Sequence, residues 1–254
     1  MLGSCTSGLD EKRELYLILE LCDYGDLKQY LIQNKKKILS GEESQFVKSR
    51  CLILWSYDIA QGMQYLSANK IMHGDLAARN ILLDGDPLQR GYLVARIADF
   101  GLSKKFYENV KYEKEARLFV PWKWMPFEYL KNDFLTLKSD VWSYGVLLWE
   151  IMSFGRIPYG HLDYNEILEK LEDGYRLTCP VEIKTISSWS PETLYQNASK
   201  TCFVEDLEER GTFSDILRIL EEELWEEEKM CYKEMEESYQ QIYAKTYLNL
   251  RQTL

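Results

Sequence analysis

Residues 73–80 read HGDLAARN, and residues 99–101 read DFG. The first segment lies between two short apolar runs, residues 70–72 and 81–83, and a third run, residues 95–98, leads into the second segment. Short apolar runs bounded by polar and turn-forming residues are typical of strands. The sequence therefore predicts two polar loops that follow strands, the first of which carries both an aspartate and an asparagine.

Three side chains on these loops, Asp75, Asn80 and Asp99, have a joint use in phosphoryl transfer. That reaction needs a positioned hydroxyl, Mg²⁺ bound by hard oxygen ligands, and neutralised charge on the phosphoryl oxygens. Asp75 would accept the hydroxyl proton, Asn80 would give a neutral oxygen to one metal ion, and Asp99 would give an anionic oxygen that bridges metal and phosphate. Asp and Asn are also common in ordinary turns, so each segment alone has a structural explanation. The order and spacing of the two segments favour the catalytic interpretation.

The two segments resemble the catalytic loop and the metal-binding tripeptide of protein kinases. The LAARN form of residues 76–80 is similar to that of receptor tyrosine kinases rather than to that of serine/threonine kinases. The resemblance implies a catalytic role for Arg79, which steadies the base and the phosphate, and structural roles for His73 and Phe100. It also implies ATP and Mg²⁺ as cofactors, and transfer of the γ-phosphoryl group to tyrosine in proteins, including the kinase itself.

Two positions depart from the family pattern. Gly74 stands where the family usually has an arginine that pairs with an activation-loop phosphotyrosine, which implies weaker switching by phosphorylation. The usual Ala-Pro-Glu is Pro126-Phe127-Glu128 here, and Arg210 resembles the buried partner of Glu128. The alternative interpretation is therefore a catalytically incompetent, kinase-like binding or scaffold lobe. The intact acid and amide side chains of the two loops argue against it, because a scaffold has no physical need of all three.

Composition restricts the classes of function. The chain has 254 residues, of which 46% are hydrophobic and 28% charged, as in a soluble globular protein. Residues 205–237 hold 14 acidic and 4 basic side chains, so the net charge of −10 lies in that segment and no basic face for nucleic acid is expected. The sequence has no apolar run of about 18 residues and no signal-peptide pattern, so no membrane segment is expected in this chain. The six cysteines lack paired spacing, and with only two histidines they indicate neither a disulfide scaffold nor a zinc site.

A nucleotide-binding hinge is implied near the N-terminus. Residues 15–19 are expected to form a buried strand, and residues 20–27, ELCDYGDL, resemble the kinase hinge. There the backbone of Glu20 and Cys22 would pair with the adenine edge, and Leu19 would guard the back pocket. The remaining ATP-binding residues implied by the resemblance are Gly25, Asp26, Arg79 and Leu82.

Helical patterns follow along the chain. Apolar residues at helical spacing predict an amphipathic helix over residues 50–68, beneath the catalytic loop. Residues 33–49 are polar and lysine-rich, and are expected to be a solvated loop or, by resemblance, a short form of the insert of receptor kinases. Residues 84–91 have turn chemistry, which predicts a hairpin. Further helices are expected at residues 164–172 and between residues 202 and 220.

The run SDVWSYGVLLWEIM at residues 139–152 is apolar on nearly every face, which predicts a helix that is buried all round. Ser139 and Asp140 are expected to be an N-cap pair. The resemblance gives Asp140 another task, to hold the backbone of the catalytic loop. A plain N-cap role for Asp140 is the alternative.

Substrate and regulatory residues are implied by the resemblance. The segment Pro121, Trp122, Lys123 and Trp124 resembles the segment of tyrosine kinases that shapes a site for an extended tyrosine-containing peptide. Tyr107 and Tyr112 lie where the family has its regulatory tyrosines. Tyr247, with Asn249 two residues later, is a candidate docking site for a phosphotyrosine-binding adaptor, although so short a motif also occurs by chance.

The predicted fold is mainly α (α+β), a protein kinase C-terminal lobe with a remnant of the small-lobe sheet and short β-hairpins at the catalytic loop. Residues 1–22 would be the remnant of the small lobe and the hinge strand, residues 23–224 the large lobe, and residues 225–254 an acidic helical extension and tail. The glycine-rich loop and the strand lysine of the family are missing from the sequence, so this chain alone is expected to be inactive. The parent protein would be a plasma-membrane receptor with this portion in the cytosol, which forms a homodimer on binding its ligand.

Overall fold

The computed structural model describes residues 3–5, 16–40, 49–85, 92–105, 121–186, 189–226 and 228–229, and most of these residues are helical. The described helices are α2 (Leu27–Ser40), α3 (Cys51–Ala68), α5 (Phe127–Asn132), α6 (Leu137–Met152), α7 (Tyr164–Glu172), α8 (Pro191–Cys202) and α9 (Phe213–Glu223), with 3₁₀ turns η1 (Ala78–Asn80), η2 (Trp122–Trp124) and η3 (Val181–Thr185). The described strands form three antiparallel pairs, β1 (Gly3–Cys5) with β2 (Tyr16–Ile18), β3 (Ile71–Met72) with β6 (Lys104–Lys105), and β4 (Ile81–Asp84) with β5 (Val94–Ile97). This architecture confirms the predicted mainly helical lobe with small sheets.

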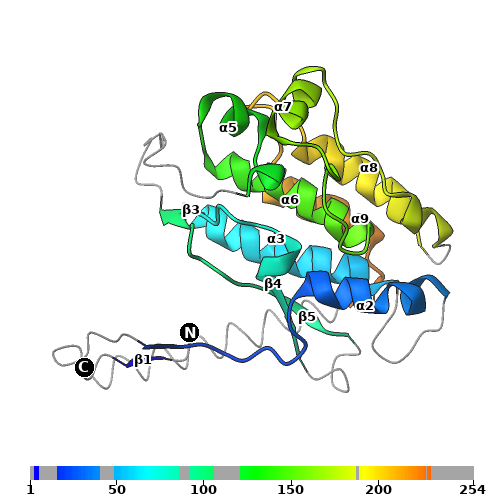
Figure 1. The fold of residues 1–254 in the computed structure, drawn as a ribbon. Coiled ribbons are helices and arrows are strands. Elements are labelled where there is room, and N and C mark those ends of the chain that lie inside the picture. Colours follow the sequence, from blue (N-terminus) through cyan, green and yellow to red (C-terminus); the bar gives the residue numbers. More distant parts are fainter. Residues whose placement is uncertain are drawn as a thin grey trace.

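Helix α6 is the centre of the fold and is buried from Ser139 to its end at Met152. In Figure 1 it lies between α3 on one side and α5 and α7 on the other. The helix begins at Leu137, and its N-cap is Thr136, whose Oγ1 accepts a hydrogen bond from the backbone N–H of Lys138 at 3.1 Å. The predicted N-cap pair Ser139-Asp140 is therefore wrong. Ser139 completes the cap by accepting a hydrogen bond from the Thr136 N–H, and Asp140 is released for another contact.

Helix α3 occupies the range predicted for it and joins the hairpin to the helical core. Its apolar side is buried, with Trp55, Ile59 and Met63 all at 0% exposure. The Trp55 indole N–H donates to the carbonyl oxygen of Leu93 at 2.7 Å, which fixes the chain leading into β5 against this helix. Tyr144 of α6 donates its hydroxyl to the Ser56 carbonyl at 2.8 Å. The two central helices are thus joined by a buried hydrogen bond as well as by apolar packing.

The solvated loop predicted over residues 33–49 is wrong for residues 33–40, which continue α2. Leu27, Leu31 and Ile38 share one buried face of this helix, and that packing outweighs the polar composition of the rest. Lys35 forms an ion pair with Glu182 at 3.2 Å, so at least one lysine of the segment has a protein partner.

The helices predicted between residues 202 and 220 have different limits in the structure. Helix α8 ends at Cys202, where a helix was expected to start, and α9 begins only at Phe213. Pro191 lies in the first turn of α8, where its missing N–H is not required. This helix was not predicted from the sequence, and a proline at its start is the signal that was overlooked.

The first residues after α9 pack on the N-terminal end of α3. The Arg50 guanidinium lies 4.3 Å from the Trp225 ring centre and 5.5 Å from that of Trp189. It also donates to Glu228 Oε1 at 3.1 Å and to the Glu223 carbonyl at 2.9 Å. Cation–π contacts and charge-assisted hydrogen bonds therefore fix the start of the acidic extension to the lobe. Among the described residues, no helix combines the length and apolar character needed to cross a membrane.

Candidate active site

Asp140 of α6 holds the start of the catalytic loop. Its carboxylate accepts the backbone N–H of His73 at 2.7 Å and that of Gly74 at 3.0 Å. The residue is 2% exposed, and this burial raises the pKa of its carboxyl group to about 6, although the two N–H donors favour the charged form. The structure thus shows Asp140 in contact with the loop backbone rather than in the alternative N-cap role.

Gly74 has a backbone conformation that few other residues adopt without strain. Its φ is +78°, and a Cβ atom placed on it would lie 3.0 Å from the carbonyl oxygen of Leu102. Glycine reaches positive φ at little cost because it has no Cβ. Glycine therefore avoids the strain that a residue with a Cβ atom would meet at this position.

His73 is a buried structural residue whose tautomer follows from its contacts. Its Nδ1 accepts the backbone N–H of Asp75 at 3.2 Å, and its Nε2 lies 3.0 Å from the carbonyl oxygen of Ala98. The ring is therefore neutral with its hydrogen on Nε2. Burial lowers the pKa of His73, which favours the same neutral form. The ring also packs 5.1 Å from that of Phe100, so His73 links the two polar loops.

Asp75 is fixed by its neighbours on η1. Arg79 forms an ion pair with Asp75 Oδ1, and the Asn80 side-chain amide donates to Asp75 Oδ2 and to its carbonyl oxygen, both at 2.8 Å. Because the Asn80 nitrogen is used in this way, its amide oxygen is left for another partner. The structure thus brings the predicted base, its arginine and one predicted metal ligand together on one turn.

Asp99 lies beside this turn and differs from Asp75 in being exposed. Its φ is +59°, and its Oδ1 accepts the Gly101 N–H at 3.2 Å. The Ala98 N–H donates to the Asn80 carbonyl at 2.9 Å, which connects the backbones of the two loops. Among the described residues, no hydrogen bond engages Asn80 Oδ1 or Asp99 Oδ2. Amide and carboxylate oxygens are ligands that Mg²⁺ prefers, so these residues fit a magnesium ion.

The predicted hinge is attached to the hairpin that follows the catalytic loop. The Leu83 N–H donates to the Gly25 carbonyl at 2.9 Å, and Asp26 forms a bridge with Leu82. Asp26 Oδ1 also accepts the Gln29 N–H at 2.9 Å, which caps the first turn of α2. These contacts place Gly25, Asp26 and Leu82 side by side.

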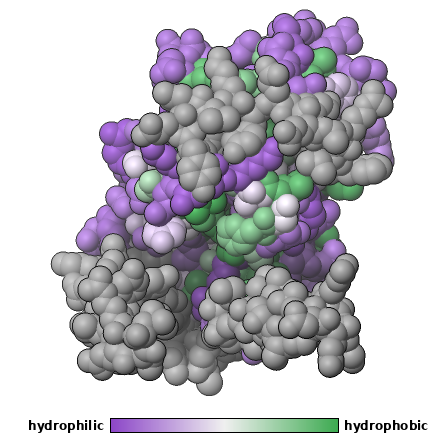
Figure 2. All heavy atoms as spheres, turned by 90° about the vertical axis from the view of Figure 1, so that its left-hand side faces the viewer, coloured by the Kyte–Doolittle hydropathy of each residue, from purple (hydrophilic) through white to green (hydrophobic). Residues whose placement is uncertain are grey.

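The other hinge residues are largely exposed. Leu19 was predicted to end a buried strand, but it follows β2 and is 64% exposed, so this part of the prediction is wrong. Cys22 is half-buried, and the exposed Glu20 pairs with Arg96 at 3.4 Å. Leu21 and Phe100 also expose apolar side chains. Figure 2 looks at the side on which β3 lies in Figure 1, and among the residues that it colours, hydrophobic ones gather near the middle with hydrophilic ones around them.

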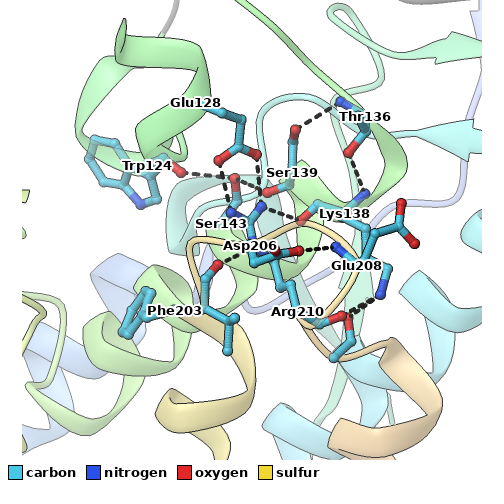
Figure 3. Close-up of polar contacts among 12 residues, drawn as sticks. Trp124, Glu128, Thr136, Lys138, Ser139, Ser143, Phe203, Asp206, Glu208 and Arg210 are labelled. Carbon is cyan, nitrogen blue, oxygen red and sulfur yellow. Dashed lines mark hydrogen bonds and ion pairs between the residues drawn. The ribbon is translucent and has the colours of Figure 1, made fainter.

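Glu128 and Arg210 form a buried bidentate ion pair, with both N–O distances at 2.8 Å. Figure 3 shows Arg210 at the centre of a wider polar network. Its Nε donates to the Val204 carbonyl at 2.8 Å, and its guanidinium lies 5.2 Å from the Trp142 ring centre. The pair joins the segment after η2 to the turn before α9.

The substrate segment predicted by resemblance forms η2, after Pro121. Its Lys123 donates to the Gly160 carbonyl at 2.6 Å, and Trp122 packs 6.0 Å from the ring of Tyr164. Trp124 is largely buried, and its backbone carbonyl accepts a hydrogen bond from the Ser143 hydroxyl at 2.9 Å (Figure 3). The Arg79 guanidinium lies 4.5 Å from the Trp124 ring centre, so the catalytic loop and this segment are in contact.

One site residue was missed by the sequence analysis. Glu150 of α6 is 1% exposed, and its Oε2 accepts the Ala78 N–H at 2.9 Å and the Trp124 indole N–H at 2.8 Å. Its signal in the sequence is an acid among the apolar residues of the last two turns of α6, VLLWEIM at residues 146–152. The predicted regulatory tyrosines Tyr107 and Tyr112 and the docking tyrosine Tyr247 lie outside the described residues.

Glu150→Gln should make the free energy of unfolding less dependent on pH. Burial raises the pKa of Glu150 from 4.5 to about 7, so the folded state retains a proton where the unfolded state has released it. The free energy of unfolding therefore contains a contribution that falls as the pH rises from about 4.5 to about 7, and the variant lacks it. Urea unfolding across this range measures the effect, with exposed Glu169→Gln as the control. Parallel pH curves for the parent protein and Glu150→Gln would contradict this prediction.

Comparison with known families agrees with this geometry. The model of the protein tyrosine and serine/threonine kinase family matches residues 1–220, and the chain belongs to that family. Members of the family transfer phosphoryl groups from ATP in the presence of Mg²⁺.

Relatives of this chain include receptors and tyrosine kinases. Myoblast growth factor receptor egl-15 of Caenorhabditis elegans is 35% identical over 243 residues, 87% of this chain and 22% of the relative. Tyrosine kinase receptor Cad96Ca of Drosophila melanogaster is 34% identical over 239 residues, 93% of this chain and 28% of the relative. Tyrosine-protein kinase csk-1 of Caenorhabditis elegans is 41% identical over 173 residues, 66% of this chain and 29% of the relative. The chain thus spans less than a third of the length of each of these relatives.

Proposed function

We propose that this chain is the catalytic lobe of a receptor protein-tyrosine kinase, which transfers the γ-phosphoryl group of ATP to tyrosine in proteins. The observation that carries the proposal is the contact of Asp75 with both Arg79 and Asn80, on a loop whose backbone is bonded to the chain leading into Asp99. The receptor assignment is supported by the names of two relatives, egl-15 and Cad96Ca. The cytosolic location of this portion and ligand-driven homodimerisation of the parent protein are part of the same proposal.

Asp75 would act on the substrate hydroxyl. Its carboxylate is oriented by Arg79 on one oxygen and by Asn80 on the other, so it has little freedom to rotate. A carboxylate held in this way can accept the tyrosine proton as the phosphoryl group is transferred. Asn80 and Asp99 would hold Mg²⁺, which when bound neutralises charge on the phosphoryl oxygens.

Binding of the adenine and of the substrate peptide would use two other segments. The backbone of Glu20 and Cys22 would pair with the adenine edge, Leu19 would guard the back pocket, and Leu82 would be one of the remaining ATP-binding residues. Residues 121–124 would bind the peptide around the acceptor tyrosine. Proximity supports this arrangement, since Asp26 forms a bridge with Leu82 in β4, the strand that directly follows the catalytic loop, and Trp124 contacts Arg79 within that loop.

Asp99→Asn should weaken Mg²⁺-dependent ATP binding about 10-fold or more, because loss of even a group that supports a metal ligand typically costs about 10–100-fold in metal affinity. Calorimetric titration of a protein that contains this chain, with and without Mg²⁺, measures the change. Asp173→Asn, an exposed acid far along the chain, is the control. Equal Mg²⁺ dependence in the parent protein and in Asp99→Asn would contradict the assigned role.

Autophosphorylation is expected at Tyr107 and Tyr112, and phosphorylation at Tyr247 is expected to create an adaptor site. A phosphate adds nearly two negative charges, which an arginine-lined pocket binds strongly. Mass spectrometry of the active protein should detect phosphate on Tyr107 and Tyr112, and a phosphopeptide of residues 244–254 should bind adaptor domains better than its unphosphorylated and Asn249→Ala forms. Unmodified tyrosines in an active preparation would reject the sites, and binding of the phosphopeptide no better than that of either form would reject the adaptor motif.

A further inference from the structure

Glu150 connects two segments that are distant in the sequence. A single carboxylate oxygen, Oε2, accepts both the backbone N–H of Ala78 and the indole N–H of Trp124. The first donor belongs to η1 of the catalytic loop and the second to η2 of the substrate segment. Both bonds come from one side chain in a rigid, buried helix.

The other oxygen of Glu150 is buried and has no hydrogen-bond partner in the part of the chain that the structure describes. Burying a carboxyl group that is only partly hydrogen-bonded is unfavourable, so stability alone is a weak reason for an acid here. The two bonds that the group does make are both directed to segments of the candidate active site.

Arg79 closes a ring of contacts around Glu150. Its guanidinium lies 4.5 Å from the centre of the Trp124 ring, and it pairs with Asp75. Trp124 therefore meets Arg79 with its ring and Glu150 with its indole N–H. A displacement of Trp124 changes the surroundings of both the backbone and the arginine that orient Asp75.

We propose that Glu150 is a positioning residue that couples the substrate segment at Trp124 to the catalytic loop at Ala78. Through this coupling it places the hydroxyl of the acceptor tyrosine beside Asp75. The bonds themselves are features of the structure, and only the effect on phosphoryl transfer rests on the proposed function. Asp140 and Glu150, both on α6, hold the loop at His73 and Gly74 and at Ala78, so one helix fixes both ends of the turn that contains Asp75.

Hydrogen exchange of the full chain tests the coupling without any need for activity. Glu150→Met removes the acceptor, and amide exchange over residues 76–82 and 121–126 should become about tenfold faster in both segments. Glu150→Gln keeps an amide oxygen in place of Oε2 and should restore most of the protection. Tyr144→Phe is the matched control, because it removes a different buried hydrogen bond of α6, the one made to α3.

A double substitution separates coupling from a general loss of packing. Trp124→Phe removes the indole donor but keeps a ring under Arg79, and its effect on exchange of residues 76–82 should be absent in the Glu150→Met background. Additive effects of the two substitutions, or equal acceleration by Tyr144→Phe, would overturn the coupling.

In a kinase-active protein that contains this chain, Glu150→Met should raise KM for the tyrosine peptide and lower kcat, each by about tenfold or more, with KM for ATP unchanged. Glu150→Gln should recover most of both parameters. A change in KM for ATP alone would overturn the positioning role. If no variant and no parent protein transferred phosphate while the exchange results held, the proposed function would fail and the structural coupling would stand.

Discussion

Replacing Asp75 with asparagine is expected to lower the turnover of an active kinase that contains this chain by about 10²–10⁴-fold, which is the usual contribution of a general base. Asparagine has the shape of aspartate, but its single side-chain oxygen can replace only one of the two oxygens that accept from Arg79 and Asn80, and it cannot take up the tyrosine proton. The affinity for nucleotide should change little, because Asp75 is not one of the proposed metal ligands.

Steady-state kinetics with a tyrosine peptide and MgATP measure this effect. Asp173→Asn serves again as the control for a change of charge at an exposed site. If turnover of Asp75→Asn stayed within about threefold of the parent protein, well below the range for a general base, the assignment of the base would be wrong.

Arg210→Met is expected to lower the free energy of unfolding of this chain by about 3–5 kcal/mol, the usual cost of removing one member of a buried pair. The Arg210 side chain is fully buried, and its loss leaves Glu128 without its partner and the Val204 carbonyl without a donor. Such a change should be measurable in urea unfolding without any assay of activity.

An exposed ion pair is the matched control for this prediction. Arg218 pairs with Asp215 at 3.3 Å, but its side chain is 72% exposed, so Arg218→Met should cost less than about 1 kcal/mol. The double variant Glu128→Leu/Arg210→Met should recover part of the loss, because an apolar pair does not leave a charge buried alone. A cost for Arg210→Met no larger than that for Arg218→Met would show that the buried pair does not stabilise the lobe.

Much of the fold follows from local pattern. The apolar spacing of residues 50–68 is visible in the sequence, and α3 occupies that range. The limits of α7 also agree with the prediction, since Asp163 caps this helix through its side chain. In contrast, residues 33–40 were predicted to be a loop although they belong to α2. The polar residues of this helix outnumber the three buried ones that hold it in place, so the apolar spacing is hard to recognise.

The candidate site could be predicted only where short motifs carry the information. Asp75, Asn80 and Asp99 lie on two short motifs, and the structure joins those motifs through the Ala98–Asn80 backbone bond. The role of Glu150 depends on Ala78 and Trp124, which are 72 and 26 residues away in the sequence. A contact of that range arises from the packing of α6 against both segments, and a single sequence does not encode it in any local pattern.

Transfer of a phosphoryl group to tyrosine is the reaction that we propose for the two polar loops. The most direct measurement is the transfer of labelled γ-phosphate from MgATP to a pair of peptides that differ only by tyrosine or phenylalanine at the acceptor position, by a protein that contains this chain. We expect labelling of the tyrosine peptide alone, and loss of that labelling in Asp75→Asn. Labelling that persists in Asp75→Asn, or its absence in a protein that binds MgATP, would contradict this proposal and favour a non-catalytic binding lobe.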